Sequence, residues 1–223
     1  MLASSDPFPK KGVSKVNVKL IAALAAGLLS AAPAFSATVT LGFEGAGDYS
    51  LIREFYNGGT SETGATGTNY GISFGADALA LANTPDFTYY SNAPTPGAVM
   101  APVGASSALN VVAGFTGQAS FFYSSSAATT VSIFSGLNGS GSVLGTFNLA
   151  ANAQTGCADT LFCHWDLASV SFAGVAQSIQ FGSAANLAGF DNVSVAPVPL
   201  PAAFWLLGSS LLGLGGIARR RNS

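Results

Sequence analysis

Residues 129–149 read T-T-V-S-I-F-S-G-L-N-G-S-G-S-V-L-G-T-F-N-L and contain the clearest structural pattern in the chain. Successive side chains of a strand point to opposite faces, so Val131 and Ile133 would share one face and Phe134 the other. The dipeptide Asn138-Gly139 lies between two such runs and is typical of a hairpin turn, because both residues tolerate positive φ. This stretch therefore predicts a β-hairpin.

The rest of the region between the two ends of the chain has the same character. It is rich in Gly, Ser, Thr, Ala, Phe and Val, a composition that disfavours helices and suits short strands joined by tight turns. The sequence predicts an all-β domain over residues 37–196, an antiparallel β-sandwich of the jelly-roll type. The expected strands are Thr38–Phe43, Gly71–Phe74, Ala78–Ala82, Phe87–Tyr90, Leu109–Ala113, Ala119–Ser124, Thr129–Phe134, Val143–Leu149, Ser169–Ala173, Ser178–Phe181 and Phe190–Val195.

The C-terminal segment, residues 197–223, has a different composition. It contains Val-Pro-Leu-Pro-Ala at 198–202, an apolar run from Ala202 to Ala218 and the cluster Arg219-Arg220-Arg221. The run of about 17 residues is near the lower limit for a membrane-spanning helix. Arginines flanking such a helix stay in the cytoplasm, so everything upstream would lie outside. The segment therefore predicts a transmembrane helix at about 202–218.

Motif, apolar run and arginine cluster together resemble the PEP-CTERM sorting signals of Gram-negative bacteria, in the variant whose motif is VPLPA. The resemblance implies that a membrane-embedded cysteine protease-transpeptidase, an exosortase, cuts near the motif and releases the protein to the envelope, the cell surface or the extracellular matrix. Before that cut, the precursor would be anchored in the inner membrane and face the periplasm. An ordinary C-terminal membrane anchor is the alternative. The matching residues are Val198, Pro199, Leu200, Pro201 and Ala202.

The N-terminus, residues 1–36, has the features of a signal peptide. Four lysines precede an apolar run from Leu20 to Ala32, and Pro33 ends that run. Ala34 and Ser36 are the small residues that signal peptidase requires for a cut after Ser36. The first dozen residues add nothing to export, so the true start of translation is expected further downstream.

The charge of the exported region differs from that of the whole chain, whose formal net charge is −2. Between residues 37 and 197 the only lysine or arginine is Arg53, against nine acidic residues, which gives about −8. Such a surface argues against nucleic acid as a partner, because nucleic-acid binding relies on Lys and Arg at phosphates. It also disfavours anionic lipid headgroups and acidic polysaccharides unless divalent cations bridge the two.

Several stretches of this region resemble the ectodomains found ahead of PEP-CTERM tails. They are Tyr56–Ala82, Asn110–Phe115, Gly136–Gly141 and Gly189–Val195. The resemblance implies a β-sandwich surface protein. It implies no particular biochemical activity.

Cys157 and Cys163 are the only cysteines, and both lie in the exported region. An even pair in an oxidising compartment predicts a disulfide, here closing a short loop. A metal site that recruited His164 would still lack a ligand. Asp159, Asp166 and His164 crowd the same loop, which makes it a candidate recognition surface.

The most specific site hypothesis is a structural calcium ion. Glu44 ends the first predicted strand and Asp191 begins the last, and their motifs resemble those of jelly-roll carbohydrate-binding modules in which two such acids share one Ca²⁺. Calcium takes roughly six to eight oxygens, so backbone carbonyls and Asp48 or Asn57 would have to complete the shell. In the alternative interpretation, Glu44 and Asp191 accept hydrogen bonds from backbone amides in turns.

Catalytic motifs are missing from the sequence. His164 is the only histidine, and there is no G-x-S-x-G, H-E-x-x-H or P-loop pattern. A glycosidase needs two carboxylates that face each other across a cleft, for which Glu54 and Glu62 are the candidates. We therefore expect a protein without enzyme activity, with a glycan-active hydrolase as the least favoured alternative.

Two functions fit these observations. The first is a noncatalytic envelope or matrix protein that binds exopolysaccharide, and an open groove with exposed aromatic rings would favour it. The second is a calcium-dependent structural or adhesive surface protein, and a flat acidic face would favour it. Most of the aromatic residues considered for stacking on sugars are expected to be core or half-buried strand residues; they are Tyr49, Phe55, Tyr56, Tyr70, Tyr89, Tyr90 and Trp165.

Overall fold

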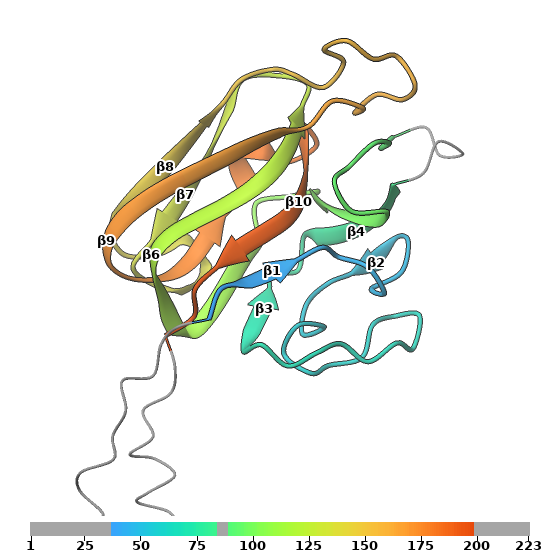
Figure 1. Ribbon diagram of the computed structural model, residues 1–223. Coiled ribbons are helices and arrows are strands. Elements are labelled where there is room, and N and C mark those ends of the chain that lie inside the picture. Colours follow the sequence, from blue (N-terminus) through green and yellow to red (C-terminus); the bar gives the residue numbers. More distant parts are fainter. Residues whose placement is uncertain (1–36, 84–88, 199–223) are drawn as a thin grey trace, which may run out of the picture. The chain divides into compact units, whose positions relative to one another are not determined.

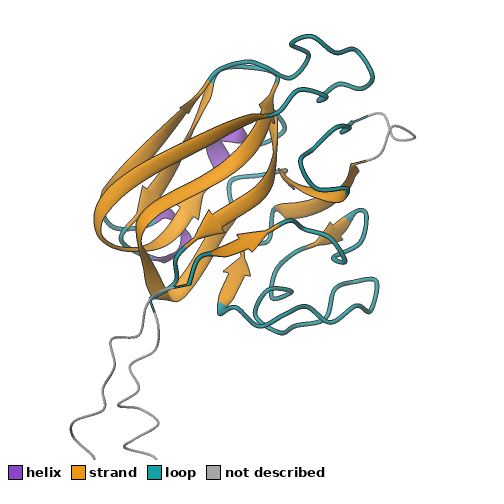
Figure 2. Cartoon of the chain, in the orientation of Figure 1, coloured by secondary structure: helices purple, strands orange, loops and turns teal. Residues whose placement is uncertain are grey.

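Ten antiparallel strands and two short 3-10 turns account for the regular structure of residues 37–83 and 89–198, the residues that the computed structural model describes (Figure 1). Figure 2 shows that strands and loops make up nearly all of this region. The strands are β1 (Val39–Leu41), β2 (Ser50–Leu51), β3 (Ile72–Phe74), β4 (Ala78–Asn83), β5 (Gly97–Pro102), β6 (Ala108–Ser125), β7 (Thr129–Phe134), β8 (Val143–Leu149), β9 (Asp166–Gln180) and β10 (Ala188–Val195), and the turns are Leu137–Gly139 and Gly182–Ala184.

The strands form two layers that share β6 and β9. In one layer β8 pairs with β7, and β7 pairs with the C-terminal end of β9. That end of β9 also pairs with the N-terminal end of β6, which pairs with β3. In the other layer the N-terminal half of β9 pairs with the C-terminal half of β6, followed by β10. Strand β10 also pairs with β1 and β5, and β4 and β2 continue from β5. The predicted all-β antiparallel sandwich is confirmed.

Glycine lets the two long strands cross from one layer to the other. The register between β6 and β9 shifts between Asn110 and Gly117, where Gly114 and Gly117 have φ values of 82° and 84°. On the β9 side Gly174 has a φ of 89°. Residues that have a side chain rarely adopt this left-handed backbone conformation, so these bends depend on glycine. Figure 1 shows β6 and β9 turning over at the same end of the domain.

The predicted hairpin is confirmed with its expected bounds. Strands β7 and β8 pair from Thr129↔Leu149 to Phe134↔Val143, and the turn between them contains Asn138 with a φ of 55° and Gly139 with a φ of 71°. Asn138 also ties the turn to β6, since its amide N–H donates to Asn110 Oδ1 at 2.7 Å.

Other strand predictions were wrong in their bounds. The separate strands expected on either side of residues 114–118 and 174–177 are continuous, because the glycine bends keep both segments in the ladder. Strand β5 was missed because prolines surround it in the sequence, at Pro94, Pro96 and Pro102. Of the strand expected at Phe87–Tyr90, residues 87–88 lie outside the described part, and Tyr90 forms only isolated bridges with Asn83 and Phe162.

Phenylalanines join the two layers. Phe121 of β6 lies 4.4 Å from Phe147 of β8, measured between ring centroids, and 5.1 Å from Phe190 of β10. Phe181 contacts both Phe121 and Phe190, at 5.8 and 4.7 Å. None of these four rings is more than 2% exposed. The cluster therefore contributes much of the apolar burial that stabilises the sandwich.

Within the described residues no helix is long and apolar enough to cross a membrane. The signal peptide at residues 1–36, the apolar run at 202–218 and the cluster Arg219–Arg221 lie outside the described residues, as do all residues of the sorting motif except Val198.

We predict that Phe121→Ala lowers the free energy of unfolding by about 3–5 kcal/mol, because it opens a cavity between the layers. Leu167→Ala, at a side chain that is 61% exposed on the same pair of strands, is the matched control and should change it by less than about 0.5 kcal/mol. Urea unfolding of both variants would measure the difference. Similar losses in the two variants would contradict the role given to the cluster.

Candidate functional site

A pocket of about 790 Å³ lies between β4, β5 and the loop that precedes β9. Its walls combine aliphatic and aromatic side chains with hydroxyl and amide groups, and none of the lining residues within 37–83 and 89–198 is charged. The volume falls in the range of ligand sites. The lining residues are Tyr49, Leu79, Leu81, Tyr89, Tyr90, Ala101, Pro102, Val103, Ser125, Ser126, Ala151, Asn152, Ala153, Gln154, Thr155, Leu161, Phe162 and Asn186.

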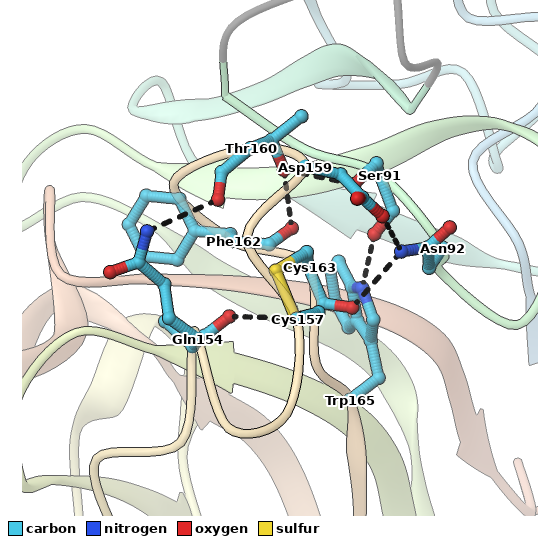
Figure 3. The surroundings of a disulfide bond; sticks show 10 residues. Ser91, Asn92, Gln154, Cys157, Asp159, Thr160, Phe162, Cys163 and Trp165 are labelled. Carbon is cyan, nitrogen blue, oxygen red and sulfur yellow. Dashed lines mark hydrogen bonds between the residues drawn. A yellow bond between two sulfur atoms is a disulfide. The ribbon is translucent and has the colours of Figure 1, made fainter.

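The loop of residues 151–165 forms one wall and contains the disulfide between Cys157 and Cys163, as the sequence predicted (Figure 3). Phe162 stacks on Tyr90 with ring centroids 4.9 Å apart, and the Phe162 amide donates to the Tyr89 carbonyl at 2.9 Å. Trp165 Nε1 donates to the Ser91 carbonyl at 2.8 Å. The loop is thus fixed to the segment that follows β4 by ring packing and by backbone hydrogen bonds.

Polar side chains add to this attachment (Figure 3). The hydroxyls of Ser91 and Thr160 lie 2.9 Å apart, and both residues are buried. Asn92 Nδ2 donates to Asp159 Oδ2 at 2.9 Å. A wall held at so many points keeps its shape when a ligand binds, which lowers the entropic cost of binding.

Exposed rings stand at the pocket. Tyr49 is 60% exposed and Tyr89 is 46% exposed, whereas Tyr90 is buried among the side chains beneath the loop. Tyr49 has a φ of 54°, which is uncommon for a bulky residue. Backbone conformations of this kind cost about 1–3 kcal/mol and are concentrated at ligand sites. In this conformation the Tyr49 side chain lines the pocket.

The aromatic residues considered for sugar stacking divide as expected between core and surface. Phe55, Tyr56 and Tyr90 are buried, and Trp165 is partly covered by Tyr90 and Ser91. Tyr70 is 41% exposed but stacks on Tyr56 beside a second, smaller pocket. Only Tyr49 and Tyr89 combine exposure with a place in the larger pocket.

Sequence reasoning missed the other walls of this pocket. Strand β5 supplies Ala101 and Pro102, and Asn186 comes from the turn before β10. The loop Ala151–Thr155 follows β8 and reaches the pocket because the disulfide loop begins there. Two sequence features pointed to this end of the domain: the polar residues around the cysteines and the aromatic candidates Tyr49, Tyr89 and Tyr90.

A second place of interest is the pair Glu44 and Asp191, proposed above as calcium ligands. Strands β1 and β10 pair through Leu41↔Val193. Glu44 comes shortly after β1 and Asp191 lies on β10, so the two acids belong to neighbouring segments of the sheet. A side chain at Gly97 would meet Glu44 Cγ at 3.3 Å, and one at Gly42 would meet both the Glu44 carboxylate and Thr95. The Glu44 carboxylate therefore lies close to Thr95, which in turn bonds Asp191.

Asp191 is completely buried and is held by hydrogen bonds. Its Oδ2 accepts from the Thr95 amide at 2.9 Å, its Oδ1 accepts from the Asn192 amide at 2.7 Å, and the Thr95 hydroxyl is within 2.9 Å of both oxygens. Burial raises the pKa of Asp191 to about 6, opposed by the bonds from Thr95 and Asn192 and reinforced by the charge of Glu44. These bonds match the alternative interpretation, in which Asp191 satisfies backbone amides.

The other two proposed calcium ligands bond elsewhere. Asp48 Oδ1 accepts from the Ala82 amide at 2.7 Å, and Asn57 Nδ2 donates to Glu54 Oε2 at 2.9 Å. In the part of the chain that the structure describes, no group of three or more Asp, Glu, His or Cys side chains could hold a metal ion. The fold thus brings together two of the four residues and does not complete a calcium shell from carboxylates.

No family profile and no curated protein matches this sequence. Among solved structures, a family 6 carbohydrate-binding module is 16% identical, with 55% of this chain and 83% of that chain covered and a TM-score of 0.37. A family 29 carbohydrate-binding module from Piromyces equi is 10% identical, covers 72% and 91%, and has a TM-score of 0.37. A family 43 arabinoxylan arabinofuranohydrolase from Bacillus subtilis is 14% identical, covers 62% and 32%, and also has a TM-score of 0.37. At these values the function has to rest on the residues of the chain itself.

Asp191 gives a pH prediction. Its carboxyl protonates near pH 6 in the folded protein and near pH 4 in the unfolded chain, so protonation favours the folded state. The stability that it contributes is present at pH 4 and is lost as the pH rises through 6, by up to about 3 kcal/mol.

Asp191→Asn removes this titration. Urea unfolding without calcium should show that the wild-type protein, relative to the variant, is more stable at pH 4 than at pH 7. A difference in unfolding free energy that stays constant with pH would contradict the raised pKa.

Proposed function

We propose that this protein is an exported, noncatalytic protein of the cell envelope or extracellular matrix that binds a neutral polysaccharide in the pocket between β4, β5 and the disulfide loop. The observation that carries the proposal is the pair of exposed rings, Tyr49 and Tyr89, at a pocket whose described lining residues are all uncharged. Aromatic rings supply flat apolar surface for the C–H faces of sugars, while hydroxyl and amide groups bond the sugar hydroxyls.

The charge distribution supports a neutral ligand. The exported region has a formal charge of about −8, so a polymer rich in uronic acids would be repelled. The described lining residues of the pocket offer no cation that could compensate, because their polar groups are hydroxyls and amides such as those of Ser126, Thr155 and Asn186. A neutral glycan meets no such repulsion.

The same lining supports a binding role over a catalytic one. Glycoside hydrolysis uses two carboxyl groups on either side of the bond that is cleaved. Among the residues that the structure describes, the pocket lining contains no carboxylate and no histidine, and neither Glu54 nor Glu62 is part of it. Glu54 instead accepts a hydrogen bond from Asn57.

Export and sorting enter the proposal from the sequence alone. A signal peptide at residues 1–36 would be removed by signal peptidase, and the motif Val198–Ala202 with its apolar run would anchor the precursor until an exosortase cuts it. A disulfide between Cys157 and Cys163 fits an oxidising compartment outside the cytoplasm. The protein would then act at the envelope, the surface or in the matrix.

Binding should depend on the two rings. We predict that Tyr49→Ala and Tyr89→Ala each weaken binding of a neutral polysaccharide about tenfold, because each removes a stacking surface worth roughly 1–1.5 kcal/mol. Affinity electrophoresis in soluble glucans, xylans and mannans, with a uronic-acid polymer for comparison, would measure it. Tyr70→Ala, a similarly exposed tyrosine outside this pocket, is the matched control.

An unchanged affinity in Tyr49→Ala and Tyr89→Ala, or an equal loss in Tyr70→Ala, would contradict the assignment of this pocket. Binding only to the uronic-acid polymer would contradict the neutral ligand. If no polysaccharide in the panel is retained, the carbohydrate proposal fails.

A calcium-dependent structural or adhesive role is the second candidate, favoured by one observation: Glu44 lies near Thr95, which bonds Asp191, and its charge acts on Asp191. A cation there would relieve the repulsion between the two carboxylates. Glu44 would be its main ligand, since the Asp191 oxygens already accept hydrogen bonds from Thr95 and Asn192. Backbone carbonyls and solvent would have to supply most other oxygens.

This candidate predicts that calcium raises the melting temperature of the wild-type protein at pH 7 and leaves that of Glu44→Gln unchanged. Glu62→Gln, which removes an exposed acid elsewhere, is the control for the general effect of charge. A melting temperature that calcium does not change in the wild type would remove this candidate, while an equal rise in all three proteins would assign the effect to screening.

A further inference from the structure

An uncharged apolar surface lies at the end of the domain where β6 and β9 turn over. Val112 is 71% exposed and Val175 is 51% exposed, and Ala113 and Ala173 beside them are exposed as well. A side chain at Gly114 would strike Val175, so the two bends adjoin. We call this surface, residues 112–117 of β6 and 173–177 of β9, the bend surface.

The bend surface differs in charge from the rest of the exported region. Strand β6 contains no charged residue, and the only one in β9 is Asp166 at its opposite end. The region as a whole has nine acids and one arginine. An acidic domain is repelled by an anionic surface, and the bend surface is a part of this domain that can approach one without that repulsion.

Both ends of the described chain emerge beside the bend surface. The Val198 amide donates to the Gly114 carbonyl at 2.8 Å, and Phe115 forms a bridge with Pro197. At the other end of the chain, Val39 pairs with Val195, three residues before Val198. Figure 1 shows β1 and the end of β10 close to the turn of β6.

The chain between this point and the apolar run is very short. Ala202, where the run begins, is four residues after Val198, and four residues of fully extended chain span at most about 14 Å. The headgroup layer on one side of a bilayer is about 5–8 Å thick. An apolar run that spans the membrane therefore holds Val198 within about 10 Å of the headgroups.

From these observations we propose that the bend surface is a membrane-contact surface, and that in the anchored precursor Val112 and Val175 insert into the headgroup layer of the bilayer. The proposal rests on the anchoring of the precursor by its apolar run. It adds an orientation, in which the domain stands on the bends of β6 and β9 with the pocket directed away from the membrane. Residues 117–125 of β6 separate the bend from the pocket by about 26 Å of strand.

The test uses the full chain, with its disulfide intact, reconstituted in vesicles of phosphatidylethanolamine and phosphatidylglycerol. The described residues have no free cysteine, so a single introduced cysteine can be labelled with an environment-sensitive fluorophore. Val112→Cys and Val175→Cys report on the bend surface. Ala150→Cys, exposed after the last residue of β8 at the opposite end of the sandwich, is the matched control.

We expect both bend labels to emit at shorter wavelength than the Ala150 label. A spin-labelled lipid with its quencher near the headgroup should also quench both of them several-fold more strongly. Flotation of the vesicles after a high-salt wash reports separately on the anchor.

If the protein floats but the bend labels match the Ala150 label, the membrane-contact proposal is wrong while the anchor stands. If the bend labels shift to shorter wavelength without quenching by the lipid, the surface is covered by protein, and the lipid assignment is again overturned. If the protein does not float, the anchor itself fails, and the membrane-contact proposal fails with it.

Discussion

The ladder between β6 and β9 is the feature on which the rest of the domain depends. These two strands pair from Tyr123↔Asp166 at one end to the glycine bends at the other, and then again through Ala108↔Gln180 in the second layer. Because both strands belong to both layers, the sandwich cannot separate at this side without breaking one continuous set of backbone hydrogen bonds. Phe121, the central ring of the phenylalanine cluster between the layers, also lies on β6.

The same ladder separates the end proposed to bind a glycan from the end proposed to contact a membrane. Beyond Ser125 and before Asp166 the chain forms the pocket and the disulfide loop, and at Gly114 and Gly174 it forms the uncharged bends. Each end has its own chemistry: rings and amides at the first, small and aliphatic residues at the second. The two proposals therefore place glycan binding and membrane contact at opposite ends of the domain.

Asp191 is an acidic residue that is buried inside the domain and fully supplied with hydrogen-bond donors. It lies on β10, between the layers' shared strand β6 and the short strand β1, and bonds Thr95 and Asn192 instead of solvent. A buried acid is stable only when its oxygens are satisfied, and here backbone amides supply much of that satisfaction. The nearby Glu44 is exposed, so the two acids that resemble each other in sequence have different environments.

The amino-acid sequence by itself determined the fold class, the hairpin at residues 129–149 and the pairing of Cys157 with Cys163. Alternation, turn residues and a lone pair of cysteines are local patterns that need no knowledge of distant segments. The tertiary structure decided which of the exposed tyrosines share a pocket, since Tyr49, Tyr89 and Asn186 lie far apart in the chain and meet only through strand pairing. It also decided that Glu44 lies near Thr95, the hydrogen-bond partner of Asp191, while Asp48 and Asn57 bond elsewhere. Such contacts depend on register and on glycine bends, which one-dimensional patterns do not specify.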